Sequence, residues 1–201
     1  MKIVLALGVL TTTIAICCCG GGDGLPFATD GAGDGFPVAE YQTACDGGDG
    51  QKCDDLAEAY DDGAGMAEDD PKALALYQKA CDLGIAAGCT NAGVMYRNGE
   101  GVTTDAQHAF RLFGQGCDAG HAMGCKNLGL LYGNGEGTEK NEMEALAKYN
   151  QACDMGLAEA CHDVAVAWTN GEGVPADPDK AKEYFKRACD GGHTESCAYA
   201  N

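Results

Sequence analysis

The sequence predicts an all-α solenoid of about five helix-turn-helix repeats, each 36 residues long and closed by one disulfide. Cysteines come in pairs eight residues apart, and the pair recurs every 36 residues. An aromatic residue stands four positions before the first cysteine of each pair, and a glycine three positions after it. Internal periods of this size are typical of solenoids, in which each unit buries its apolar face against its neighbours.

The N-terminal residues have the pattern of a targeting signal. Lys2 precedes an apolar stretch from Ile3 to Ile16, which is short for a membrane span, and three cysteines follow at once. Residues 1–19 therefore predict a bacterial export signal of the lipoprotein type. The segment resembles a lipobox, which implies lipidation at Cys17 or Cys18. Residues 20–35 are rich in Gly and Asp and predict a flexible tether.

Residues 36–201 form the predicted repeat domain, with repeats at about 38–73, 74–109, 110–145, 146–181 and 182–201. In the second repeat, Asp69 caps a first helix that Gly84 ends, and a second helix runs to the turn at Asn98. The same cap position recurs as Asp105, Asn141 and Asp177. An aromatic closes the second helix as Tyr60, Tyr96, Tyr132 and Trp168, and we expect these rings to fill the space between repeats.

The paired cysteines fall on adjacent antiparallel helices, where a bridge is within reach. We therefore predict Cys45–Cys53, Cys81–Cys89, Cys117–Cys125, Cys153–Cys161 and Cys189–Cys197. A metal site is the weaker hypothesis, since each unit offers only two thiolates and C-x-x-C is absent. An Asp follows the first cysteine of every pair, and we expect it to accept hydrogen bonds from turn amides.

Composition limits the partners. The chain has 31 Asp and Glu against 13 Lys and Arg, a formal net charge of -18. A surface of this sign repels nucleic acid and anionic lipid, so we expect no nucleic-acid partner and membrane contact only through a lipid anchor. Thirteen cysteines at fixed spacing indicate an oxidising compartment. The predicted location is the bacterial cell envelope, on the periplasmic side or the cell surface, with secretion as the alternative to anchoring.

The segment D-P-K-A-L-A-L-Y-Q-K-A-C-D-L-G-I-A-A-G-C-T-N-A-G-V-M-Y-R-N-G-E-G-V resembles a Sel-1-like repeat, a relative of the tetratricopeptide repeat. The resemblance covers nearly all of residues 38–201. It implies a right-handed α/α superhelix and, for most members, a scaffolding or adaptor role. The cysteine pairs are similar to those of a bacterial cysteine-rich branch whose secreted members are known as penicillin-binding or β-lactam-hydrolysing proteins. This implies weak binding of β-lactams or peptidoglycan fragments as a second hypothesis.

A β-lactam-hydrolysing enzyme is the weaker hypothesis, because the sequence shows no set of residues that could supply a nucleophile or a metal-bound hydroxide. Ser196 is the only serine and no lysine stands three positions after it, so a serine β-lactamase motif is absent. His121 and His193 occupy the same position two repeats apart, too far to share a metal. We expect no catalytic residue, metal or cofactor. The alternative is a penicillin-binding protein with β-lactamase activity.

We expect the solenoid to present a concave groove lined by one helix of each pair, and a scaffold needs positions there that vary between repeats, which we call the variable face. It comprises the positions nine, five and two before the first cysteine of a pair, where we expect a protein or peptide partner of the envelope to bind. We expect the apolar members Leu76, Leu112 and Tyr184 to be exposed. The candidates are Lys72, Leu76, Lys79, His108, Leu112, Gln115, Glu144, Lys148, Gln151, Lys180, Tyr184 and Arg187.

Overall fold

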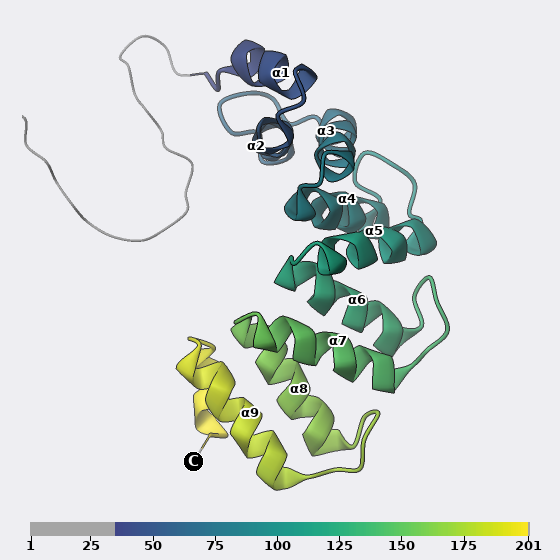
Figure 1. Cartoon of the computed structure of the whole chain (residues 1–201), viewed down its shortest axis with the longest axis vertical. Helices are drawn as coiled ribbons and strands as arrows, with labels where there is room; N and C mark the ends of the chain where they lie inside the picture. The colour runs from purple at the N-terminus through teal and green to yellow at the C-terminus, as the bar shows by residue number, and fades with distance from the viewer. Residues whose placement is uncertain (1–34, 201) are drawn as a thin grey trace, which may run out of the picture. The chain divides into compact units, whose positions relative to one another are not determined.

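A computed structural model describes residues 35–200, which fold into nine α-helices and a terminal 3₁₀ turn with no strand among them (Figure 1). The predicted export signal, the candidate lipidation sites and all but the last residue of the tether lie outside the described residues. The helices are α1 (Val38–Asp46), α2 (Gly50–Asp61), α3 (Asp70–Asp82), α4 (Ala86–Asn98), α5 (Ala106–Asp118), α6 (Ala122–Asn134), α7 (Glu142–Asp154), α8 (Ala158–Asn170) and α9 (Pro178–Asp190), followed by η1 (Thr194–Ala198).

The predicted caps start the first helix of each pair. The side-chain oxygen of Asp69 accepts a hydrogen bond from the backbone N–H of Lys72, and Asp105, Asn141 and Asp177 make the equivalent contact. Each bond satisfies an N–H that has no partner inside its helix. Helices α3, α5, α7 and α9 therefore begin four residues before the repeat boundaries expected at 74, 110, 146 and 182.

The turn that follows each second helix is built from two glycines at positive φ. Gly135 ends α6 with φ +72°, and Gly137 has φ +68°. A Cβ on Gly137 would overlap the carbonyl of Ala106, at the start of α5 in the same hairpin, so only glycine allows this approach. Between the glycines, Glu136 accepts a hydrogen bond from Asn134. The same construction recurs at Gly99 to Gly101 and Gly171 to Gly173.

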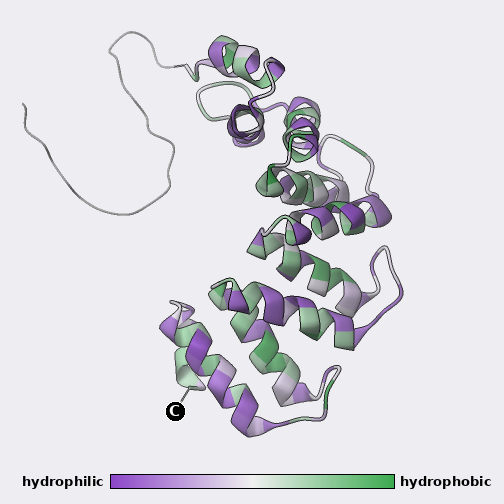
Figure 2. Ribbon diagram, in the orientation of Figure 1, coloured by the Kyte–Doolittle hydropathy of each residue, from purple (hydrophilic) through white to green (hydrophobic). Residues whose placement is uncertain are grey.

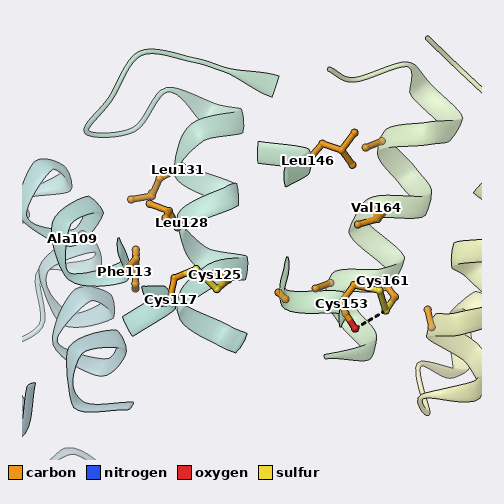
Figure 3. Packing of buried hydrophobic residues seen from close by; sticks show 14 residues of the cluster. Ala109, Phe113, Cys117, Cys125, Leu128, Leu131, Leu146, Cys153, Cys161 and Val164 are labelled. Carbon is orange, nitrogen blue, oxygen red and sulfur yellow. Dashed lines mark hydrogen bonds between the residues drawn. A yellow bond between two sulfur atoms is a disulfide. The ribbon is translucent and has the colours of Figure 1, made fainter. Parts of the chain in front are cut away.

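Each helix packs mainly against the helices before and after it in sequence, which is the arrangement of a solenoid. Figure 2 shows apolar residues concentrated on α6 and α8, while α9 is mostly polar. Buried side chains continue from one repeat to the next, and Figure 3 shows Phe113 and Leu128 close to the Cys117–Cys125 bridge. The closing aromatics Tyr96, Tyr132 and Trp168 pack against this core, as predicted.

All five predicted disulfides are present, with Cα–Cα distances of 4.4 to 4.8 Å. Each links the last turn of a first helix to the start of the second. In the last repeat the second helix is reduced to η1, and Cys197 still reaches Cys189. The disulfides therefore fix every hairpin at its tight end.

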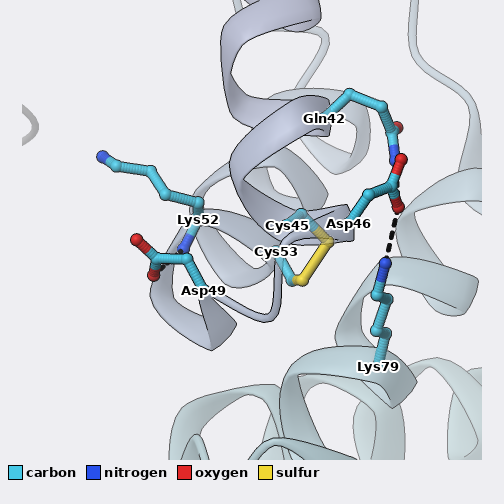
Figure 4. The surroundings of a disulfide bond; sticks show 7 residues. All are labelled: Gln42, Cys45, Asp46, Asp49, Lys52, Cys53 and Lys79. Atoms are coloured by element: carbon cyan, nitrogen blue, oxygen red, sulfur yellow. Dashed lines mark hydrogen bonds and ion pairs between the residues drawn. A yellow bond between two sulfur atoms is a disulfide. The ribbon is translucent and has the colours of Figure 1, made fainter.

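The prediction for the Asp that follows the first cysteine is wrong where its contacts are seen. Asp46 accepts hydrogen bonds from Gln42 Nε2 and from Lys79 Nζ of the next repeat, not from turn amides (Figure 4). The amides of Gly48 and Asp49 already donate to the carbonyls of Cys45 and Ala44. With the turn satisfied by backbone, the carboxylate is free to bridge two repeats.

Candidate functional site

The first positions of the variable face lie against the preceding repeat. Lys72 Nζ is 5.1 Å from the ring centroid of Tyr60, and Lys180 Nζ is 4.1 Å from that of Trp168. The ring of His108 stacks on Tyr96 at 4.1 Å. These side chains therefore cover the closing aromatic of the previous helix. Glu144 holds the same position in the fourth repeat and is exposed.

The last positions of the variable face also connect repeats. Lys79 Nζ lies 2.6 Å from Asp46 Oδ1, and Arg187 lies 2.8 Å from Asp154 Oδ1. The carboxylate of Asp46 has a lowered pKa because Lys79 and then Gln42 donate hydrogen bonds to it. Both pairs are exposed, so they orient side chains more than they stabilise the fold. Gln115 is exposed, and Gln151 is half-buried.

The prediction of exposed leucines at the middle position is wrong. Leu76 and Leu112 are 7% and 6% exposed and belong to the hydrophobic core. Leu76 stands three residues after Ala73 and four before Ala80, both fully buried, so it shares their side of the helix. Lys148 and Tyr184 are half-buried at the same position. The accessible part of the variable face is thus mainly polar.

A pocket that the sequence analysis missed lies between α6, α7 and α8. It has a volume of about 270 Å³ and is lined in part by Gly133, Leu146, Tyr149, Ala167 and Glu172. Gly133 occupies the position held by Arg97 one repeat earlier, and Ala167 the position of Leu131. Two small residues where the preceding repeat has larger ones leave this space. The replacement of larger residues by small ones at fixed positions of the 36-residue repeat was the sequence feature that could have predicted the pocket.

Histidine and serine side chains meet at the last repeat. Ser196 is fully buried, and its Oγ lies 2.9 Å from Nδ1 of both His162 and His193. A buried hydroxyl between two rings has its hydrogen-bonding capacity used inside the protein. Within residues 35–200, no group of three or more His, Cys, Asp or Glu side chains is arranged to hold a metal ion.

The repeats match a known family model. The Sel1 repeat model matches residues 53–85, 86–121, 122–157 and 158–193, four consecutive segments that span most of the helical domain. The chain belongs to the Sel1 repeat family. Its matched segments begin in the second helix of one pair and end after the first helix of the next, so they are shifted in phase from the hairpin unit.

Solved structures support the fold. A Sel1 repeat protein from Oxalobacter formigenes is 23% identical with a TM-score of 0.74, covering 79% of this chain and 63% of that one. A protective antigen of uropathogenic Escherichia coli with an SLR fold is 23% identical with a TM-score of 0.76, covering 81% and 35%. Cysteine-rich protein B of Helicobacter pylori is 28% identical with a TM-score of 0.53, covering 63% and 91%.

This Sel1 repeat chain thus spans less than two thirds of the length of the first two of those proteins. A search of curated proteins gives no match. None of the helices in residues 35–200 is both long and apolar enough to cross a membrane. Five disulfides in one small domain indicate an oxidising environment outside the cytoplasm.

Proposed function

We propose that this protein is an exported scaffold that binds a protein or peptide partner across its first helices α3, α5, α7 and α9. Sel1 repeat arrays commonly mediate protein–protein contacts. The observation that carries the proposal is the anchoring of the variable face. Its side chains differ from repeat to repeat, yet Lys79, His108, Lys180 and Arg187 are each held by a neighbouring repeat. Such preorganisation lowers the entropic cost of binding.

A photo-crosslinking side chain at Gln115 tests the scaffold. Gln107 is the matched control, because it is also an exposed glutamine of α5 but lies eight residues earlier, outside the variable face. In the envelope of a producing bacterium, we expect a discrete adduct from position 115 at several times the yield from position 107. Equal yields from both positions, or no adduct, would contradict the proposed surface.

The envelope location is part of the proposal. It is supported by the disulfides, and by the apolar N-terminal stretch that ends at Cys17. The β-lactam hypothesis has no support in the comparisons or in the geometry of residues 35–200, because the two hydroxyls that lie against histidine rings, Ser196 and Thr90, are both buried. Hydrolysis of a chromogenic β-lactam by the purified protein would support the β-lactamase hypothesis instead.

A further inference from the structure

The pocket between α6, α7 and α8 replaces an ion pair that exists one repeat earlier. Arg97, in the last turn of α4, places its Nε 3.1 Å from Oε2 of Glu136 in the following repeat. Gly133 and Glu172 stand 36 residues after Arg97 and Glu136. The carboxylate is therefore retained while the arginine is lost. Among residues 35–200, no basic side chain forms an ion pair with Glu172.

The floor and wall of the pocket suit a long side chain with a charged end. Ala145, Leu146 and Ala167 are 4% to 6% exposed and give an apolar floor. Lys140 stands on the rim, but its Nζ is 2.7 Å from Glu142 Oε1, so its charge is already compensated. Glu172 accepts a hydrogen bond from Asn170 at Oε1 and is left as the carboxylate of the lining that has no ion-pair partner among the described residues.

Tyr149 adds an aromatic wall. In the second repeat the hydroxyl of Tyr77 donates to Asp61 at 3.3 Å, but the residue equivalent to Asp61 beside Tyr149 is Gly133. Burial, and then the nearby carboxylates of Asp163 and Glu172, raise the pKa of Tyr149 to about 12. The phenol is thus neutral, and the two nearby carboxylates outweigh the one nearby cation, Arg97, which favours a further cation beside the ring.

We propose that this pocket receives an arginine side chain from the partner, a role that rests on the proposed scaffold function. Its volume of about 270 Å³ lies below the roughly 300–1,000 Å³ of small-molecule sites and suits one side chain. Apolar residues contact the methylene stem, Tyr149 contacts the planar guanidinium, and Glu172 pairs with it as Glu136 pairs with Arg97. The net charge of -18 favours a basic partner over an acidic one.

The test titrates the whole protein with N-acetyl-arginine amide at about 0.15 M salt, where long-range attraction is screened. The readout is the ring resonance of Tyr149, assigned with a Tyr149→Phe variant. We expect a saturable shift, and at least fivefold weaker binding of the neutral analogue N-acetyl-citrulline amide. We expect Glu172→Gln to weaken arginine binding threefold to tenfold, whereas Glu183→Gln, an exposed change of the same charge on α9, leaves it unchanged.

Gly133→Arg builds into the pocket the residue that Arg97 provides earlier, and we expect it to abolish binding. Gly133→Ala is the control, because its Cβ would meet only Ala145 Cβ, at 3.7 Å, and the pocket stays open. No saturable shift, equal binding of the citrulline analogue, or full binding by folded Gly133→Arg would overturn the proposal. If Gly133→Arg does not fold, the Glu172→Gln comparison decides. A failed titration beside a positive crosslink from Gln115 removes the arginine pocket and leaves the scaffold.

Discussion

At the scale of single residues, the surroundings constrain two residues, the charge of Asp54 and the side chain allowed at Gly137. Asp54 on α2 is 3% exposed, and its Oδ1 has no hydrogen-bond partner. Burial, and then the negative charges of Glu58 and Asp55, raise the pKa of Asp54 to about 7. A buried carboxyl without a partner is stable mainly in its protonated form. This makes Asp54 a source of pH-dependent stability.

We predict that Asp54→Asn stabilises the protein above neutral pH. Because the pKa of Asp54 is higher in the folded state, the folded state binds more protons, and the free energy of unfolding falls as the pH rises from about 4 to about 7. At pH 7 the carboxyl is only about half ionised in the folded state, so the decline ends once the pH has passed the folded-state pKa. Asp54→Asn should raise the free energy of unfolding at pH 8 by about 1–3 kcal/mol and flatten the decline, as measured by urea denaturation.

The control for that experiment is Asp62→Asn, which makes the same charge change at the exposed C-cap of α2. An equal gain from both variants would show that net charge, rather than burial of Asp54, is responsible. No gain from Asp54→Asn would show that the carboxylate is satisfied when ionised.

Gly137 is the second such residue, because its approach to Ala106 leaves no room for a Cβ. We predict that Gly137→Ala destabilises the protein by about 3 kcal/mol or more, since positive φ is combined with overlap of the Ala106 carbonyl. Gly120→Ala is the matched variant, because Gly120 also has positive φ but has no neighbour within 4 Å of a new Cβ. It should cost only about 1–2 kcal/mol. Thermal unfolding followed by circular dichroism measures both, and equal losses would refute the close-approach argument.

At the scale of the helical hairpin, the disulfide and the cap do most to define the element. Isolated helices of 13 residues have marginal stability in water. The second helices α4 and α6 also have an interior glycine, Gly93 and Gly129 respectively, which lowers their helix propensity. A disulfide between cysteines eight residues apart reduces the conformational entropy of the unfolded chain, while the Asp or Asn cap fixes where the first helix starts. Packing of Phe113 against Gly93 then joins one hairpin to the next.

We predict that the paired change Cys81→Ser and Cys89→Ser lowers the free energy of unfolding by roughly 2.5 kcal/mol, from the entropy of closing a short loop. The equivalent change at Cys189 and Cys197 should affect mainly the last repeat, since η1 packs mainly against α9. Hydrogen exchange separates the two cases. Similar loss of protection across all repeats in both variants would contradict this local view, and ten titratable thiols in the native domain would contradict the bridges.

At the scale of the whole molecule, each repeat of the described domain packs against the repeats before and after it, so neighbouring repeats stabilise one another. The exposed pairs Lys79–Asp46 and Arg187–Asp154 join repeats at the surface, and the buried core joins them inside. A partner that spans several repeats would therefore meet an ordered surface. The strong acidity of the chain selects against polyanions at the same time.

Lipidation remains a prediction at this scale. We expect metabolically added palmitate to label the full-length protein and the label to be lost in either Cys17→Ser or Cys18→Ser, which also identifies the modified residue. Two acyl signals give stable anchoring, so the labelled protein should fractionate with membranes and the variant should not. Such an anchor would also hold a scaffold near a partner in the envelope. Unlabelled protein in the culture medium would favour plain secretion.

The sequence by itself determined the all-helical repeat, the five disulfides and the caps. Each depends on contacts within about 36 residues, and the periodic pattern repeats that information five times. Only the tertiary structure decided that Leu76 is buried, that Asp46 pairs with Lys79, and that a pocket opens at Gly133. The ion pair and the pocket depend on which residue of the next repeat faces a given position, and spacing along one helix does not contain that information. For Leu76 the spacing from Ala73 and Ala80 did favour the buried side, and the packing of neighbouring helices decided it. The proposed function rests on these contacts between repeats.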